Sequence, residues 1–129
     1  MASQNYFTFF TLYLFFYFLS TTTTLASPKP VIFDIRNDLP NNVVGNLALR
    51  CGQDPTSNPK VGEHYNRTFK VDQSLDCTAQ WTRFFLTWDG YQEKRDGGHS
   101  TIYWSVRKDG FYHSFDASNW KRVETWGTD

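Results

Sequence analysis

The ten residues from Tyr103 to Tyr112, YWSVRKDGFY, constrain the fold more than any other stretch of this 129-residue chain. Apolar and polar side chains alternate on both sides of Asp109-Gly110, which predicts two antiparallel strands joined by a two-residue turn. A type I′ turn, with positive φ at both central residues, suits this dipeptide. It would pair Lys108 with Phe111, Val106 with His113, and Trp104 with Phe115.

The two faces of this hairpin differ in polarity. One face is mostly apolar and is expected to pack against a core: Ile102, Trp104, Val106, Phe111, His113 and Phe115. The other is amphipathic and is expected to meet solvent: Tyr103, Ser105, Arg107, Tyr112 and Ser114. The alternation accounts for the whole stretch as structure, and nothing in it requires catalysis.

The rest of the chain carries further short strand patterns and no sustained helical periodicity. Strands are predicted at 31–39, 43–51, 65–71, 77–81, 83–89 and 120–126. Gly- and Pro-rich loops separate them at 52–64 and 90–100. About seven or eight short strands at this spacing predict an all-β antiparallel sandwich or barrel.

The N-terminal segment differs from everything that follows it. Residues 1–26 hold no charged side chain, and Tyr6 to Leu19 is a run of 14 mostly large apolar residues. A membrane span needs about 20 such residues, so the run better fits a secretory signal peptide cleaved after Ala26. An uncleaved anchor is the alternative. We therefore expect a signal peptide at 1–26, one domain at 27–129, and a protein secreted to the extracellular space (the apoplast of a plant).

Cysteine usage and one sequon agree with secretion. Cys51 and Cys77 are the only cysteines, and an even number in a secreted chain predicts a disulfide, with two buried free thiols as the alternative. Asn66-Arg67-Thr68 is the only glycosylation sequon, so Asn66 is expected on the surface.

Catalytic and metal-binding patterns are not found. The histidines His64, His99 and His113 have no motif context, so an acid–base pair of His64 and His99 is only an alternative. Zinc-ligand spacings are lacking, and we predict no metal, no cofactor and no enzymatic activity. A formal net charge of zero argues against nucleic acid and an anionic membrane as partners, and no stable membrane insertion is expected after signal cleavage.

Two surface features remain as candidate binding groups. The charge run at 93–96 is either a solvated loop or a partner contact, which makes four loop residues candidates: Lys94, Arg95, Asp96 and His99. Trp81 and Trp104 are expected in the core. Trp88, Trp120 and Trp126, if exposed, would suit an alternative in which the chain binds carbohydrate.

The chain resembles the plant self-incompatibility protein S1 family, from about Val31 to Trp126. The resemblance rests on the order and spacing of several segments: VIFDIRNDL, LALRC, VGEHYNRTF, CTAQW, FFLTWD and YWSVRKDGFY. It implies a small secreted plant protein with a β-sandwich fold, no catalytic activity, and a role as a ligand recognised at the cell surface. The family usually has a second disulfide, but Ile102 occupies the place of one of its cysteines. This departure predicts a more mobile 90–101 loop.

The predicted function is that of a secreted, non-enzymatic recognition ligand that binds a cell-surface receptor through loops. The candidate loops are 52–64, 90–101 and the Asp109-Gly110 tip, because loops on a rigid scaffold commonly carry recognition. The alternatives are a small secreted hydrolase or nuclease that uses the loop histidines, and an apoplastic carbohydrate-binding module.

Overall fold

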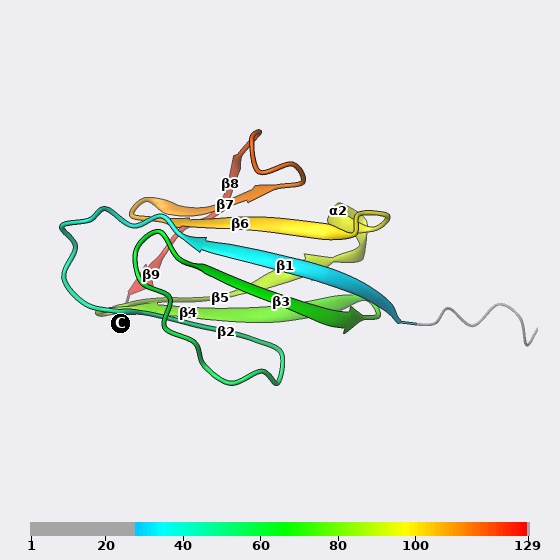
Figure 1. Ribbon diagram of the computed structural model, residues 1–129, viewed down its shortest axis with the longest axis horizontal. Helices are drawn as coiled ribbons and strands as arrows, with labels where there is room; N and C mark the ends of the chain where they lie inside the picture. Colours follow the sequence, from blue (N-terminus) through cyan, green and yellow to red (C-terminus); the bar gives the residue numbers. More distant parts are fainter. Residues whose placement is uncertain (1–27, 129) are drawn as a thin grey trace, which may run out of the picture.

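The computed structural model describes residues 28–128, so the predicted signal peptide at 1–26 lies outside the described residues. Two β-sheets stack face to face (Figure 1). The five-stranded sheet has the order β3 (His64–Val71), β1 (Lys29–Asn37), β6 (Thr101–Arg107), β7 (Gly110–Ser114) and β8 (Lys121–Glu124). The four-stranded sheet has the order β2 (Leu47–Cys51), β4 (Ser74–Trp81), β5 (Phe84–Gln92) and β9 (Gly127–Thr128).

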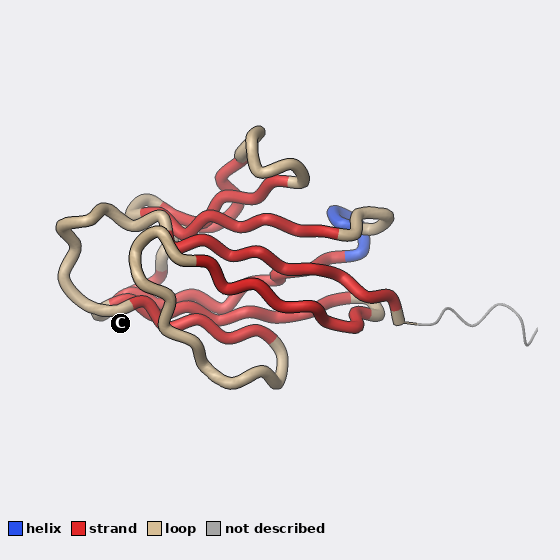
Figure 2. The backbone as a smooth tube through the Cα atoms, in the orientation of Figure 1, coloured by secondary structure: helices blue, strands red, loops and turns tan. Residues whose placement is uncertain are grey.

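The all-β sandwich prediction is confirmed, with nine strands in place of about seven or eight. Neighbouring strands run antiparallel except β1 and β6, which pair in parallel. A parallel pair needs a long connection, and here β2, β3, β4, β5 and α2 lie between the two strands in the chain. Within residues 28–128 the one helix is α2 (Glu93–Asp96), a single turn between β5 and β6 (Figure 2).

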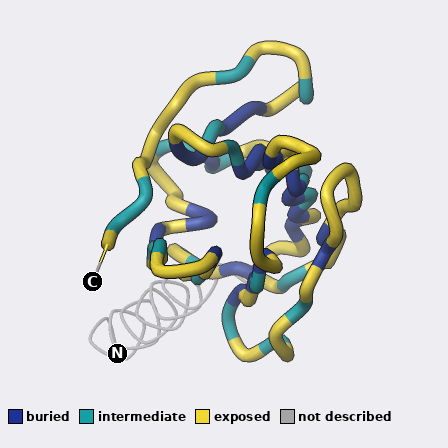
Figure 3. The backbone as a smooth tube through the Cα atoms, turned by 90° about the vertical axis from the view of Figure 1, so that its left-hand side faces the viewer, coloured by how far each residue is buried: buried dark blue, intermediate teal, exposed yellow. Residues whose placement is uncertain are grey.

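Side chains that alternate along each strand fill the space between the sheets. From the five-stranded sheet come Phe33, Ile35, Ile102, Trp104, Val106 and Phe111, all with no exposed surface. Leu47, Leu49, Trp81 and Trp88 face them from the other sheet. Buried segments lie inside the molecule while exposed loops surround them (Figure 3), as the period-two pattern requires.

The predicted disulfide is present. Cys51 and Cys77 are bonded, with a sulfur–sulfur distance of 2.02 Å, and both are fully buried. They lie directly opposite each other in the antiparallel pair of β2 and β4. Gly90 leaves the space that the bridge occupies, because a Cβ atom at residue 90 would lie 2.5 Å from the Cys77 sulfur.

The hairpin of β6 and β7 forms with its predicted inner face but with a different register. Val106 pairs with Phe111 and Trp104 with His113, so the central turn residues are Lys108 and Asp109. Neither has positive φ, which excludes the predicted type I′ turn; Gly110, at φ +148°, follows them. The shift is two residues, an even number, so the side chains keep their predicted faces.

Two further details differ from the prediction. Ser105 and Ser114 are buried rather than solvent-exposed, because Ser105 bonds to Asp38 and Ser114 bonds to the turn at Asp116. β2 begins at Leu47 instead of residue 43, since Gly45 has φ +92° and cannot continue an extended strand.

Candidate recognition surface

The loop between β5 and β6, residues 93–100, carries all four of the predicted partner-contact residues. It lies at one end of the sandwich (Figure 1). Lys94 and His99 are exposed, whereas Arg95 is half-buried and Asp96 is fully buried. The four residues therefore divide into two that face solvent and two that point inward.

Asp96 is the centre of a buried ion cluster. One carboxylate oxygen lies 2.8 Å from Nε2 of His113 on β7, and the other lies 2.7 Å from Nη2 of Arg95. The backbone N–H of Gln92 donates to the same carboxylate at 2.9 Å. Burial alone would raise the pKa of Asp96, but the hydrogen bonds from His113 and Arg95 outweigh it and hold the pKa below its usual range.

This arrangement changes the role expected of Asp96. A carboxylate with no exposed surface offers a partner nothing to contact, so Asp96 holds the loop in place instead. Arg95 has a similar part, because its guanidinium lies over the ring of Trp104 at 5.0 Å and donates to the carbonyl of Asp89.

His99 and Lys94 present the outer surface of this loop. The imidazole of His99 stacks on the ring of Phe115, with the ring centres 3.6 Å apart. Beside it is an open hollow of about 310 Å³, lined by Lys29, Pro30, Val31, Tyr91, Gly98, His99 and Ser100. The hollow is therefore partly apolar and has the side chains of His99 and Lys29 in its lining, whereas Lys94 is exposed on the same loop without lining it.

Ile102 stands where the family resemblance predicts a cysteine. Ile102 is fully buried and packs in the core. The contact from Asp96 to His113 joins the 93–100 loop to β7, across 17 residues of sequence. A noncovalent link thus connects the loop to the sheet where the expected second disulfide is missing.

The other two candidate loops lie elsewhere. The turn of β6 and β7 is at the opposite end of the sandwich from α2 (Figure 1). The 52–64 segment runs beside β2 and is held by Asp54, which accepts hydrogen bonds from Tyr65 at 2.8 Å and Arg67 at 3.2 Å. Burial of Tyr65 and its hydrogen bond to Asp54 raise the pKa of the Tyr65 hydroxyl to about 12. The three loops do not form one surface.

The histidines do not form an acid–base pair. His64, on β3, pairs in register with Arg36 and bonds to Asp34 at 2.7 Å. His99 precedes β6 on the other side of β1. His113 is buried against Asp96. Within residues 28–128 no group of three or more His, Cys, Asp or Glu side chains is arranged to hold a metal ion.

The tryptophans are mostly structural. Trp81 and Trp104 are in the core as predicted, but Trp88 is also buried, which removes it from any sugar-stacking platform. Trp126 donates to the carbonyl of Arg107 and packs against Phe111. Trp120 lies beneath the guanidinium groups of Arg36 and Arg107. None of the three is a freely exposed ring.

Asn66 lies on the exposed side of β3, in register with Asp34. Its side chain is therefore accessible at the edge of the five-stranded sheet. Among the described residues, no helix is both long and apolar enough to cross a bilayer.

Sequence reasoning missed the link between Asp96 and His113. One signal was available, because the hairpin pattern placed His113 on the inner face, and a buried histidine needs a polar partner. The partner itself was not predictable, since it lies in a loop whose path depends on the packing of both sheets.

The described residues thus form a disulfide-bonded β-sandwich in which the 93–100 loop is tied to β7 by Asp96 and no catalytic groups converge. The sequence model described as plant self-incompatibility protein S1 matches residues 33–126, and the chain belongs to this family. Membership supports a recognition or signalling role in a plant. No curated protein and no solved structure matches the chain.

Proposed function

We propose that this protein is a secreted, non-enzymatic ligand that binds a cell-surface receptor protein through the 93–100 loop. The observation that carries the proposal is the buried Asp96 cluster, which orders this loop and leaves Lys94 and His99 facing solvent. A loop held in one conformation loses little conformational entropy on binding. Secretion rests on the apolar segment at 1–26 and on the family.

The absence of enzymatic activity is part of the proposal. A hydrolase needs a nucleophile or activated water beside a base, and a further group that stabilises charge. His64 and His99 lie on opposite sides of β1, and His113 is occupied by Asp96. Neither the hydrolase alternative nor stacking of sugars on tryptophan is favoured by a specific contact.

The test measures binding of the fluorescently labelled, secreted protein to plant cells of the tissue that expresses its receptor. We expect saturable binding that unlabelled protein displaces and that protease treatment of the cells abolishes. The double variant Lys94→Glu/His99→Ala should bind at least about tenfold more weakly, as expected for central contact residues.

The matched control is Arg83→Glu, a charge reversal in the turn at the other end of β5, where Arg83 is exposed. It should bind like the wild type. Equal losses in both variants, or binding that resists protease treatment, would contradict a receptor contact through this loop. Circular dichroism of each variant verifies that the fold is intact.

A further inference from the structure

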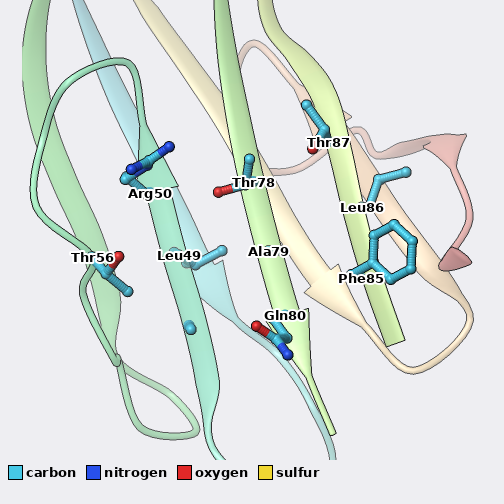
Figure 4. A pocket seen from close by; sticks show the side chains of 10 residues that line it. Leu49, Arg50, Thr56, Thr78, Ala79, Gln80, Phe85, Leu86 and Thr87 are labelled. Atoms are coloured by element: carbon cyan, nitrogen blue, oxygen red, sulfur yellow. The ribbon is translucent and has the colours of Figure 1, made fainter. Parts of the chain in front are cut away.

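The outer face of the four-stranded sheet is hollowed along its length. Two adjoining hollows, of about 210 Å³ and about 420 Å³, share the side chains of Arg50, Thr78 and Thr87. Figure 4 shows the first, where these three side chains project from neighbouring strands and Thr56 rises from the loop beside them. Together the hollows form a trough along β4, which we call the sheet trough.

Strand register arranges the lining of the sheet trough in rows. Gln80 lies between Ala48 and Phe85, and Thr78 lies between Arg50 and Thr87. Asp76 follows, paired across the sheet with Asp89. From Gln80 to Ser74 the trough extends over seven residues of β4, or about 20 Å at the usual rise per residue. Its groups are fixed by strands, which position side chains more precisely than loops do.

Four polar side chains of the sheet trough have no side-chain partner among the described residues. No side-chain hydrogen bond or ion pair within residues 28–128 uses Arg50, Thr78, Gln80 or Thr87. On the outer face of the other sheet, by comparison, several polar side chains bond to one another: Asp34 with His64, Ser105 with Asp38, and Tyr112 with Asp109.

An aromatic ring completes the lining. Phe85 is 47% exposed, and its neighbour on β9 is Gly127, which has no side chain to cover it. A large apolar side chain left this exposed on a rigid strand is a candidate contact for a ligand. The faces of sugar rings carry C–H groups that pack on aromatic rings, while their hydroxyl groups bond to amide, hydroxyl and guanidinium groups.

We propose that the sheet trough binds a linear, neutral oligosaccharide, with Phe85 as the stacking ring and Arg50, Thr78, Gln80 and Thr87 as its hydrogen-bonding groups. The open, elongated shape suits an unbranched chain. A neutral chain fits best because Arg50 and the carboxylate of Asp76 line the same trough, and Asp89 is paired with Asp76 across the sheet. An acidic chain attracted by Arg50 would be repelled by the negative charge of the Asp76–Asp89 pair.

This inference goes beyond the proposed receptor contact and does not depend on it. The sheet trough uses none of the residues of the 93–100 loop. It also uses none of the tryptophans that the sequence offered for sugar binding. A secreted protein that carries both surfaces would attach to an extracellular polysaccharide and leave its recognition loop free.

The experiment is isothermal titration calorimetry of the secreted protein with cellohexaose, a linear neutral oligosaccharide. We expect saturable binding. Phe85→Ala should weaken it about tenfold, and Gln80→Ala should weaken it several-fold, at roughly 1 kcal/mol for a lost neutral hydrogen bond. The matched control is Phe115→Ala, which removes a ring of similar exposure, 38%, far from the trough, and should leave the affinity unchanged.

Three outcomes would overturn the proposal: no saturable binding of cellohexaose, equal losses from Phe115→Ala and Phe85→Ala, or binding only of hexagalacturonate or a branched mannose glycan. Amide chemical shifts provide a second readout, and they should change on β2, β4 and β5 rather than on β1 and β3. If cell binding survives Phe85→Ala while saccharide binding is lost, the two surfaces act separately. If Lys94→Glu/His99→Ala loses cell binding but still binds cellohexaose, the receptor contact is affected and the saccharide site is not.

Discussion

At the scale of single residues, Asp96 is the side chain that holds the 93–100 loop to the rest of the domain. Its carboxylate accepts from an arginine, a histidine and a backbone N–H while it is fully buried. Removing the carboxylate is costly, because the half-buried Arg95 loses its counter-ion and the buried His113 loses its hydrogen-bond partner. The run of charged residues at 93–96 predicts a surface position for Asp96, whereas the structure buries its carboxylate between β5 and β7.

The variant Asp96→Asn should lower the free energy of unfolding by about 3 kcal/mol at neutral pH. The control Asp72→Ala, at an exposed position, should change it by no more than about 0.5 kcal/mol. Urea denaturation followed by tryptophan fluorescence measures both. An unchanged midpoint for Asp96→Asn would mean that the ion cluster adds nothing to stability.

The same variant should alter the response to acid. The folded-state pKa of Asp96 is lowered, so its contribution is present above its unfolded pKa of about 3.9 and is lost as the pH falls through the folded value. Asp109 and Asp116 also have lowered pKa values, so some acid sensitivity should remain. The decline in urea midpoint below about pH 4 should be shallower in Asp96→Asn than in the wild type.

At the scale of elements, the 93–100 loop presents two opposing expectations. The missing second disulfide predicts a mobile loop, whereas the hydrogen bonds around Asp96 predict a restrained one. The amide of Gln92 donates to Asp96, and the amides of Gly97 and His99 donate to carbonyls within the loop. We expect protection at these three amides, because exchange requires those bonds to open.

Hydrogen exchange followed by NMR measures this directly. The internal comparison is Val44, which is 82% exposed in a loop, and its amide should exchange fast. If the Gln92 amide exchanges as fast as the Val44 amide, the hydrogen bonds around Asp96 do not restrain the loop, and the loop is mobile as the missing disulfide predicts. In Asp96→Asn the protection at Gln92 should decrease, since its acceptor loses charge.

The hairpin of β6 and β7 shows how far pattern alone reaches at this scale. Alternation predicted which side chains point inward, and Trp104, Val106 and Phe111 do so. The register was wrong by two residues, because the turn dipeptide was taken to occupy the central positions. A Cβ at Gly110 would lie 2.4 Å from the carbonyl oxygen of Glu124, so the glycine allows β8 to approach. The requirement for glycine at residue 110 therefore comes from β8, a strand that follows later in the chain.

At the scale of the whole molecule, the disulfide connects two strands of a small domain. Cys51 and Cys77 are 26 residues apart, which corresponds to about 3.5 kcal/mol in the chain-entropy model. The double variant Cys51→Ala/Cys77→Ala should lose about this amount in guanidinium denaturation while it keeps a β-sheet circular dichroism spectrum. A fully unfolded variant would show that the sheets alone cannot support the domain, and an unchanged one that the bridge is dispensable.

The sequence by itself determined the class of fold, the inner face of most strands, the disulfide and the family. These follow from local alternation, from the number of cysteines and from the order of several short motifs. Only the tertiary structure decided the parallel pairing of β1 with β6, the burial of Asp96 against His113, and the sheet trough. Each brings together residues distant in sequence, and no local pattern records which distant strands become neighbours.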